Sequence, residues 1–422
     1  MSASDARTTI PAWVVVVALA LLTGLQPLTT NMYLPALPQM QQGLGMTGAA
    51  AQSTLSALIL SFGIGQLVWG PIADRWGRQI VLRSGLALFV MASLLTVVAQ
   101  DGHTMVLARA AQGACLSAAV VCSRAMIRDL FQPEEGARMM SKGMTGLGAI
   151  ALLGPITGGL TATFMGWRAT MAALALAGLV VLVFVWIKLP ETLPASRKQT
   201  KLDWGRLLSQ WRGISQHRTF RAHTLLTSST YGGLYVYLAL SSFAFINVLG
   251  CSRTLYGVYM ATLSLSYLIG TFLCRRWLPS HGLVGTIGLA GWFSLAGGAY
   301  MGAASLATWM GHLPPSWALL PGMWLYAFAH GIHQPCGQTG VVSAFPQQAG
   351  AATALSGFVL ATAAFLVGLL LSQITSMPGI AQSIHPMTLG MALGGATTAW
   401  VAHSLVKRDG LPPSIQAIPA SA

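Results

Sequence analysis

The chain is interrupted in its first quarter by a charged stretch, Gly70-Pro71-Ile72-Ala73-Asp74-Arg75-Trp76-Gly77-Arg78-Gln79. Long apolar runs flank it at residues 50–71 and 80–99. Glycine and proline permit a tight turn between two closely packed helices. Asp74 is placed to accept hydrogen bonds from the backbone amides of a helix N-terminus. Arg75 and Arg78 are placed to pair with Asp74 or with lipid phosphates. The stretch therefore predicts a short charged loop between two membrane-spanning helices.

The same alternation of apolar runs and short loops continues along the whole chain. The 422 residues are 54% hydrophobic and only 8% charged, whereas a soluble domain is about one quarter charged. Each run approaches the roughly 20 residues that a helix needs to cross the hydrocarbon core. We therefore predict an all-α integral membrane protein with twelve transmembrane helices, near 12–34, 50–71, 80–99, 103–127, 138–163, 168–188, 222–247, 254–277, 283–306, 316–340, 348–374 and 386–406. The first run is too long for a signal peptide and is expected to be retained.

The net charge of +14 would suit a nucleic-acid-binding protein as well as a membrane protein. The location of the charges distinguishes the two classes. On the predicted topology, only Arg168 and Arg253 fall on one side of the membrane. The opposite side carries Arg75, Arg78, Arg83, Arg128, Arg138, Lys142, Lys188, Arg197, Lys198, Lys201, Arg206, Arg212, Arg218, Arg221, Arg275, Arg276, Lys407 and Arg408. This bias predicts a multi-pass protein of the bacterial inner membrane with both termini cytoplasmic, and no nucleic-acid partner.

One break in composition divides the chain. It predicts a six-helix half at 1–189, a cytoplasmic linker with a surface-lying helix at 190–221, and a second half at 222–422. A weak echo of the first charged loop, at Gly270–Gly282, suggests that the halves are related. The five cysteines are scattered without CxxC spacing and predict neither a disulfide framework nor a metal site. We expect no cofactor and a monomer.

Four motifs carry a resemblance to a known family. The stretch Gly70–Gln79 matches G-x-x-x-D-R-x-G-R-[RK] of the major facilitator superfamily, except at its last position. Arg109–Gly113 resembles the R-x-x-Q-G motif of proton-linked members, and Gly154–Gly159 resembles the G-P-x-x-G-G motif of exporters. Asn31–Ala36 resembles the D-M-Y-L-P-A of Bcr/CflA-type drug-resistance transporters. The likeness is strong over the first six predicted spans and looser over the rest.

The resemblance implies roles for particular residues. The motif residues Gly70, Asp74, Arg75, Gly77 and Arg78 would form a cytoplasmic gate, with Asp74 and Arg78 acting against the other half. Arg109, with Gln112, would tune a neighbouring proton site or the substrate. A bendable, closely packed segment would be formed by Gly154, Pro155, Gly158 and Gly159. Small residues at this spacing also suit plain helix packing, and the two interpretations are compatible.

The sequence departs from the family where Asn31 replaces the usual aspartate, because an amide cannot carry a proton. All nine acids fall in predicted loops, tails or span ends. A buried carboxylate is the usual proton carrier and the usual partner of a cationic drug. We therefore expect a neutral, zwitterionic or anionic substrate, with Arg109 the buried charge available to it.

His330 and His333 are the candidates for proton coupling, since histidine titrates near physiological pH. They lie three residues apart on one helix face, and the alternative is a pair of hydrogen-bonded polar residues lining a cavity. Further cavity candidates are Gln26, Tyr231, Tyr235, Tyr256, Tyr259, Gln334 and Gln338. The tyrosines equally suit anchors at the membrane interface.

The motifs predict a secondary active exporter of a small amphipathic molecule, of the drug-efflux type, working by alternating access and linked to protons. The alternatives are export of an endogenous metabolite such as a siderophore, and import or facilitated movement by the same fold. No HExxH, paired intramembrane acid or nucleotide-binding loop supports an enzyme or an ATP-driven pump.

Overall fold

The computed structural model describes residues 10–194, 203–377, 380 and 383–411. The predicted charges at Asp5, Arg197, Lys198 and Lys201 lie outside these residues. The described part of the chain contains helices and connecting turns but no strand. The expected all-α class is therefore confirmed.

The helices of the first half begin where the sequence supplies caps or glycines. Thr47 accepts from the amide of Ala50 at 3.1 Å, and Asp101 accepts from the amide of Thr104 at 2.8 Å. Such caps satisfy amides that the first turn leaves unpaired. The elements are α2 (Ala12–Asn31), η1 (Leu34–Ala36), α3 (Leu37–Gly43), α4 (Gly48–Trp76), α5 (Arg78–Val98), α6 (Gly102–Leu130), α7 (Pro133–Phe164) and α8 (Trp167–Lys188).

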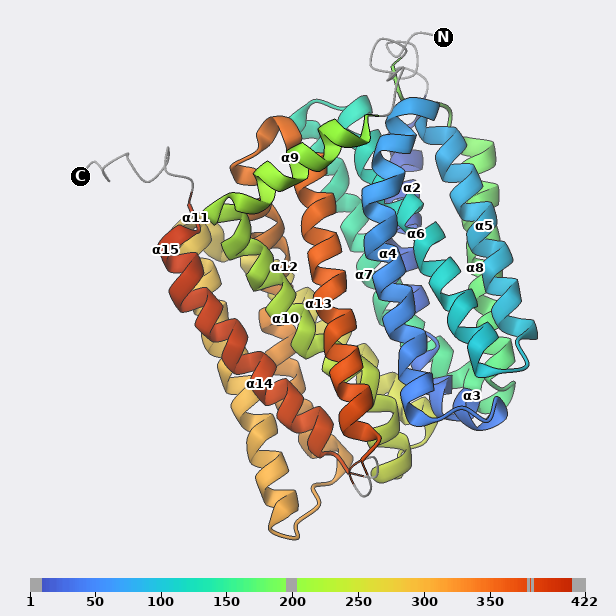
Figure 1. Ribbon diagram of the computed structural model, residues 1–422, viewed down its shortest axis with the longest axis vertical. Helices are drawn as coiled ribbons and strands as arrows, with labels where there is room; N and C mark the ends of the chain where they lie inside the picture. The colour runs from blue at the N-terminus through green and yellow to red at the C-terminus, as the bar shows by residue number, and fades with distance from the viewer. Residues whose placement is uncertain (1–9, 195–202, 378–379, 381–382, 412–422) are drawn as a thin grey trace. The chain divides into compact units, whose positions relative to one another are not determined.

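The second half has fewer charges and more irregular helix ends. Its elements are α9 (Trp204–Gln216), α10 (Arg218–Ser242), η3 (Phe243–Val248), α11 (Arg253–Trp309), η4 (Ser316–Leu319), α12 (Leu320–Ser343), η5 (Pro346–Gln348), α13 (Ala349–Thr375), α14 (His385–Val401), η6 (Ala402–Val406) and α15 (Lys407–Asp409). The surface helix expected in the linker corresponds to α9, which crosses the direction of α10 (Figure 1).

Within the described residues, nine helices are long and apolar enough to cross a membrane. One of them, α11, unites the eighth and ninth predicted spans, because only Gly282 (φ 64°, ψ −179°) breaks its helical backbone. Two further predicted spans form α12, which carries polar side chains, and α14, which has 17 residues. With α11 counted as two, the protein is a bundle of twelve transmembrane helices in two six-helix halves.

The helices form two compact units. The first comprises Met1–Trp204 with Arg253–Ala261, and the second comprises Gly205–Ser252 with Thr262–Ala422. The predicted boundaries at 189 and 221 stay a prediction. In the first unit α4 packs along α6, α5 packs against α6 and α8, and α2 packs along α7. In the second unit α10 is central and contacts α12, α13 and α14.

Apolar side chains fill each unit. In the first unit a cluster around Leu82, Phe89 and Leu116 joins α5 to α6 and the neighbouring helices. In the second, a cluster around Leu226, Ile287 and Ile332 joins α10, α11 and α12. Many outward-facing side chains are also large and apolar, among them Val98, Trp186 and Leu393. An apolar exterior is what a helix bundle presents to lipid.

Candidate functional site

The Gly70–Gln79 stretch forms a charge cluster at the junction of α4 and α5. The Arg78 guanidinium contacts Asp74 at 2.5 Å through Nη2 and donates to Asp129 Oδ2 at 3.1 Å through Nε. Asp129 lies near the end of α6, and the side chains of Arg78 and Asp129 are each only 6% exposed. The cluster therefore ties the ends of three helices through one buried arginine.

Glu191, just beyond α8, completes the junction. Its carboxylate accepts from the amides of Arg78 at 2.9 Å and Gln79 at 3.2 Å, and so caps the N-terminus of α5. It also accepts from the amides of Thr192 and Leu193, both at 2.9 Å. The prediction that Asp74 accepts from a helix N-terminus is wrong: Asp74 pairs with the Arg78 side chain, and Glu191 caps the helix.

The backbone between α4 and α5 explains one of the two glycines of the motif, Gly77. Gly77 adopts φ 107° and ψ 153°, a conformation that side-chain-bearing residues rarely adopt. A Cβ atom at Gly77 would also overlap the Glu191 carboxylate. At Gly70 a Cβ atom would meet only Val121, at 3.9 Å. Arg75 is exposed and has no resolved role in the cluster.

Arg109 lies at the centre of a second, fully buried network. Its Nη1 donates to Gln112 Oε1 at 2.9 Å, and its Nη2 donates to the carbonyl of Thr29 at 3.1 Å. The guanidinium stacks over the Tyr33 ring with 4.0 Å to the ring centroid, which is cation–π geometry. Gln112 Nε2 in turn donates to Ser93 Oγ at 2.8 Å. These contacts link α2, α5 and α6 without a carboxylate among them.

Asn31 and Gln26 lie on α2 near this network. Thr30 Oγ1 donates to Asn31 Oδ1 at 3.1 Å and to the Gln26 carbonyl at 3.2 Å. Both side chains are half-buried. Asn31 thus stands where the family resemblance expects an acid and is held by the hydroxyl beside it.

The glycine motif of α7 makes backbone contacts that leave no room for side chains. A Cβ atom at Gly158 would overlap the Met32 carbonyl on α2. At Gly159 it would lie 2.7 Å from the Arg253 carbonyl, at the start of α11. Gly257 makes the reciprocal contact from α11, because a Cβ atom there would lie 2.5 Å from the Pro155 carbonyl oxygen. At Gly154 the nearest atom would be a Leu28 methyl at 3.2 Å. The motif therefore has a packing role, and its hinge role stays a prediction.

The two α12 histidines have different surroundings. His330 Nδ1 is hydrogen-bonded to Thr230 Oγ1 at 3.2 Å, and its ring lies near those of Tyr231 and Tyr267, at 6.1 and 5.6 Å. His333 Nε2 donates to the Ile287 carbonyl at 3.2 Å. Both side chains are buried, so His330 faces polar side chains of α10 and α11 whereas His333 bonds the backbone of α11.

The remaining cavity candidates are scattered. Tyr235 and Tyr256 are fully buried, while Tyr231 and Tyr259 are half-buried. Gln334 and Gln338 are half-buried on α12, and Gln334 Oε1 has no hydrogen-bond partner among the described residues. No group of three or more metal-ligating side chains occurs in the described part of the chain. Of these positions, Tyr231 is in ring contact with the predicted coupling residue His330.

Several participants were missed in the sequence. Asp129 and Glu191 complete the junction, and Ser93 and Thr29 complete the Arg109 network. Glu191 carried a readable signal, since it is an isolated acid flanked by Pro190 and Pro194 at the end of an apolar run. Nothing in the spacing marked Ser93 or the Thr29 carbonyl as partners.

Two six-helix halves, with buried charges at helix junctions of the first, define the class: a polytopic membrane transporter of the two-repeat plan. The model of the Major Facilitator Superfamily matches residues 19–369. The chain therefore belongs to that superfamily and is a multi-pass membrane transporter, not an enzyme.

Relatives and solved structures agree with this membership. The chain is 28% identical over 341 residues to multidrug resistance protein D of Escherichia coli K12, covering 80% of this chain and 83% of that protein. It is 26% identical over 378 residues to a chloramphenicol resistance protein of Pseudomonas aeruginosa, covering 87% of each. A D-xylose–proton symporter structure superimposes with a TM-score of 0.72 at 15% identity, covering 92% of this chain and 97% of that one, which shows the fold alone.

Proposed function

We propose that this transporter exports small amphipathic molecules of the antibiotic type by alternating access, as a secondary active exporter. The observation that carries the proposal is the similarity of this chain, over 80% and 87% of its length, to proteins named for multidrug resistance and chloramphenicol resistance. The sequence Gly154–Gly159 of α7 supports it, because it resembles the motif associated with exporters.

The junction cluster supports a gating role. Asp74 is 37% exposed while Arg78 and Asp129 are buried, so one carboxylate of the cluster remains accessible. In the proposed cycle Asp74 and Arg78 act against the second half, and Arg78 exchanges partners during the change of state. The positive-inside bias supports cytoplasmic termini in a bacterial inner membrane. We propose in addition that the transporter acts as a monomer.

The Arg109 network bears on the substrate. It holds a buried positive charge without a carboxylate, and each described acid lies at a helix end or in a loop. Such an interior has no anion to bind an organic cation. The proposed substrate is therefore neutral, zwitterionic or anionic. Arg109 is closed to solvent in this state, so contact with substrate requires the helices around it to separate.

Proton coupling is assigned to His330, the histidine surrounded by Thr230, Tyr231 and Tyr267, with His333 as its neighbour. Asn31 cannot serve, because an amide does not titrate near neutral pH. Export of an endogenous metabolite such as a siderophore is a second version of the same chemistry, and import is a third.

The test uses everted vesicles with chloramphenicol as the probe, with and without an imposed pH gradient. Export in cells corresponds to uptake by these vesicles, and we expect that uptake to respond to the gradient. Changing both His330→Gln and His333→Gln should remove the response, whereas His281→Gln with His312→Gln, two exposed histidines, should not. Movement only in the opposite direction would exclude an exporter.

Asn31, which replaces the aspartate usual in the family, allows a second experiment with the same vesicles. If the wild type ignores the gradient and Asn31→Asp becomes sensitive to it, coupling has been lost at this position and the histidine assignment fails. Asn247→Asp, at an exposed asparagine of η3, is the matched control for adding one acid.

A further inference from the structure

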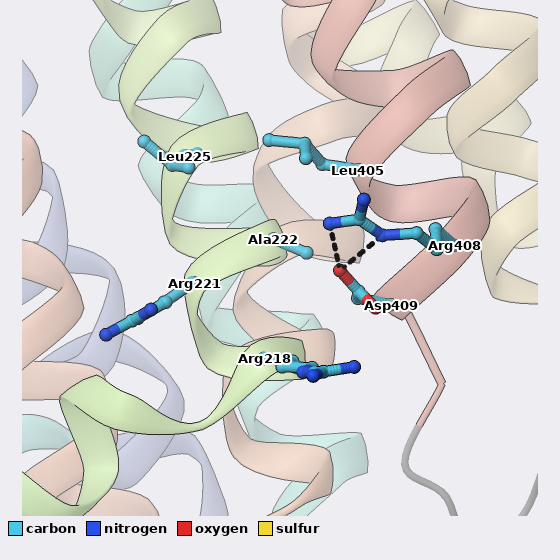
Figure 2. A pocket seen from close by; sticks show the side chains of 7 residues that line it. All are labelled: Arg218, Arg221, Ala222, Leu225, Leu405, Arg408 and Asp409. Carbon is cyan, nitrogen blue, oxygen red and sulfur yellow. Dashed lines mark hydrogen bonds and ion pairs between the residues drawn. The ribbon is translucent and has the colours of Figure 1, made fainter.

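We propose that the depression between α10 and the α14–α15 end binds an anionic phospholipid, whose phosphate contacts arginines and whose acyl chain follows Leu225 and Leu405. The depression is lined by Arg218, Arg221, Ala222, Leu225, Leu405, Arg408 and Asp409 (Figure 2). Its volume is about 420 Å³, within the size range of small-ligand sites. All lining residues belong to the second compact unit.

Among the residues that line the depression, positive charge exceeds negative charge. Three arginines and one aspartate line it, which gives the lining residues a net charge of +2. Asp409 forms an ion pair with Arg408, which donates to Asp409 Oδ2 at 3.0 Å through Nε and at 2.9 Å through Nη2. Arg221 donates through Nε to the Ser215 carbonyl at 2.8 Å, which leaves its Nη donors pointing away from α10 (Figure 2). Arg218 has no hydrogen bond or ion pair with any described residue and extends toward Asp409 (Figure 2).

The local backbone increases the need for an anion. Arg218 and Arg221 both lie in the first turn of α10, which holds no acidic residue. The N-terminal end of a helix is positive, so two cations there repel it unless an anion lies nearby. A phosphate beside Arg218 would reduce this repulsion and could accept paired N–H bonds from its guanidinium.

The apolar part of the lining distinguishes a lipid from a free phosphate. Ala222 is buried, and Leu225 is 46% exposed one helical turn beyond the arginines. Leu405 faces it from η6 (Figure 2). This order, cations at the helix end and apolar side chains one turn inward, matches a headgroup followed by an acyl chain. Nearby α9 ends next to Ser215 and exposes Trp204 and Leu208 beside Arg206, which is the composition of a helix lying in the membrane interface.

The experiment counts lipids bound to the purified full-length transporter by native mass spectrometry. The probes are dioleoylphosphatidylglycerol, dioleoylphosphatidylcholine, and inorganic phosphate. We expect the first to bind preferentially and inorganic phosphate not to compete. Arg218→Gln with Arg221→Gln should weaken the anionic lipid roughly 30-fold, since each interfacial arginine contributes about fivefold.

The matched control is Arg206→Gln with Arg212→Gln, two exposed arginines of α9, which removes the same charge outside the depression. Asp409→Asn should act in the opposite direction and tighten binding about fivefold, because it removes the one carboxylate. Equal loss in the two double variants, or no gain in Asp409→Asn, would overturn the site. Competition by inorganic phosphate would assign the same arginines to a free anion and overturn the lipid.

Discussion

The two glycine junctions, Gly77 between α4 and α5 and Gly282 within α11, solve the same problem with different chemistry. Each has a positive φ, 107° and 64°, and each separates two long helices with a single non-helical residue. At Gly77 a Cβ atom would overlap Glu191, whereas at Gly282 it would have no neighbour within 4 Å. At the second junction, Arg276 stacks at 5.2 Å on the Phe272 ring.

The difference between the two junctions shows which part of the Gly70–Gln79 motif makes the turn and which part adds the charge cluster. Glycine alone suffices to join two helices, as Gly282 does. The carboxylates Asp74, Asp129 and Glu191 are additional and surround only the first junction. We infer that the two junctions share a backbone role, while the gate proposed above belongs to the first.

The comparison predicts its largest effect at Arg78. Arg78→Ala removes the buried arginine that pairs with the buried carboxylate of Asp129, which costs about 3 kcal/mol of unfolding free energy. Arg276→Ala removes only an exposed arginine from a ring and should change stability by less than about 1 kcal/mol. Denaturant titration of both purified variants measures the difference. Equal losses would show that the first junction has no special dependence on charge.

The next effect concerns the glycines themselves. Gly77→Ala and Gly282→Ala both impose a backbone conformation that costs about 1–3 kcal/mol for an L-residue. Gly77→Ala must also displace Glu191, so it should be the more damaging by about 1 kcal/mol. Thermal unfolding of the pair in one detergent gives this difference. A larger drop for Gly282→Ala would contradict it.

A smaller effect is expected from the cap alone. Glu191→Ala removes an acceptor from the amides of Arg78 and Gln79 and should lower stability by about 1–2 kcal/mol. Because the same carboxylate opposes a Cβ atom at Gly77, its removal should make Gly77→Ala less harmful in the double variant. If the stability losses of Glu191→Ala and Gly77→Ala simply add in the double variant, the cap and the turn act independently and this expectation is wrong.

The smallest effect compares this distant cap with a local one. Asp101 caps α6 from the adjacent residue, and hydrogen bonds from the amide and hydroxyl of Thr104 lower the pKa of its carboxyl. A lowered pKa gives stability that is present above the unfolded-state pKa and lost as pH falls through the folded-state pKa. The melting temperatures of wild type and Asp101→Asn should therefore differ slightly at neutral pH and converge in acid. A constant gap would refute this.

The fold was largely predictable from the sequence because lipid imposes helices of one length on apolar runs. Its exception lies at the eighth and ninth spans, where one glycine replaces the expected loop and α11 continues on both sides of it. Hydropathy identifies the apolar segments but does not separate two helices joined by a single residue. The surface helix of the linker, now α9, was predictable from its composition.

The site was less predictable, and the reason is distance along the chain. Arg78 and Arg109 were identified from local motifs, but their partners Glu191 and the Thr29 carbonyl lie 113 and 80 residues away. Spacing can place His330 and His333 on one face, yet it does not show that one meets side chains and the other a backbone carbonyl. Assignments within one helix turn were accessible; those between helices were not.

The position of Glu191 has a consequence for the newborn chain. The Arg78 amide at the start of α5 has no capping carboxylate until Glu191 is synthesised, 113 residues later. At translation rates of roughly 5–20 residues per second, that interval lasts roughly 6–23 s. During this time the first junction lacks its cap. The start of α5 is therefore capped only after the six helices of the first half, the last of which is α8, have been synthesised.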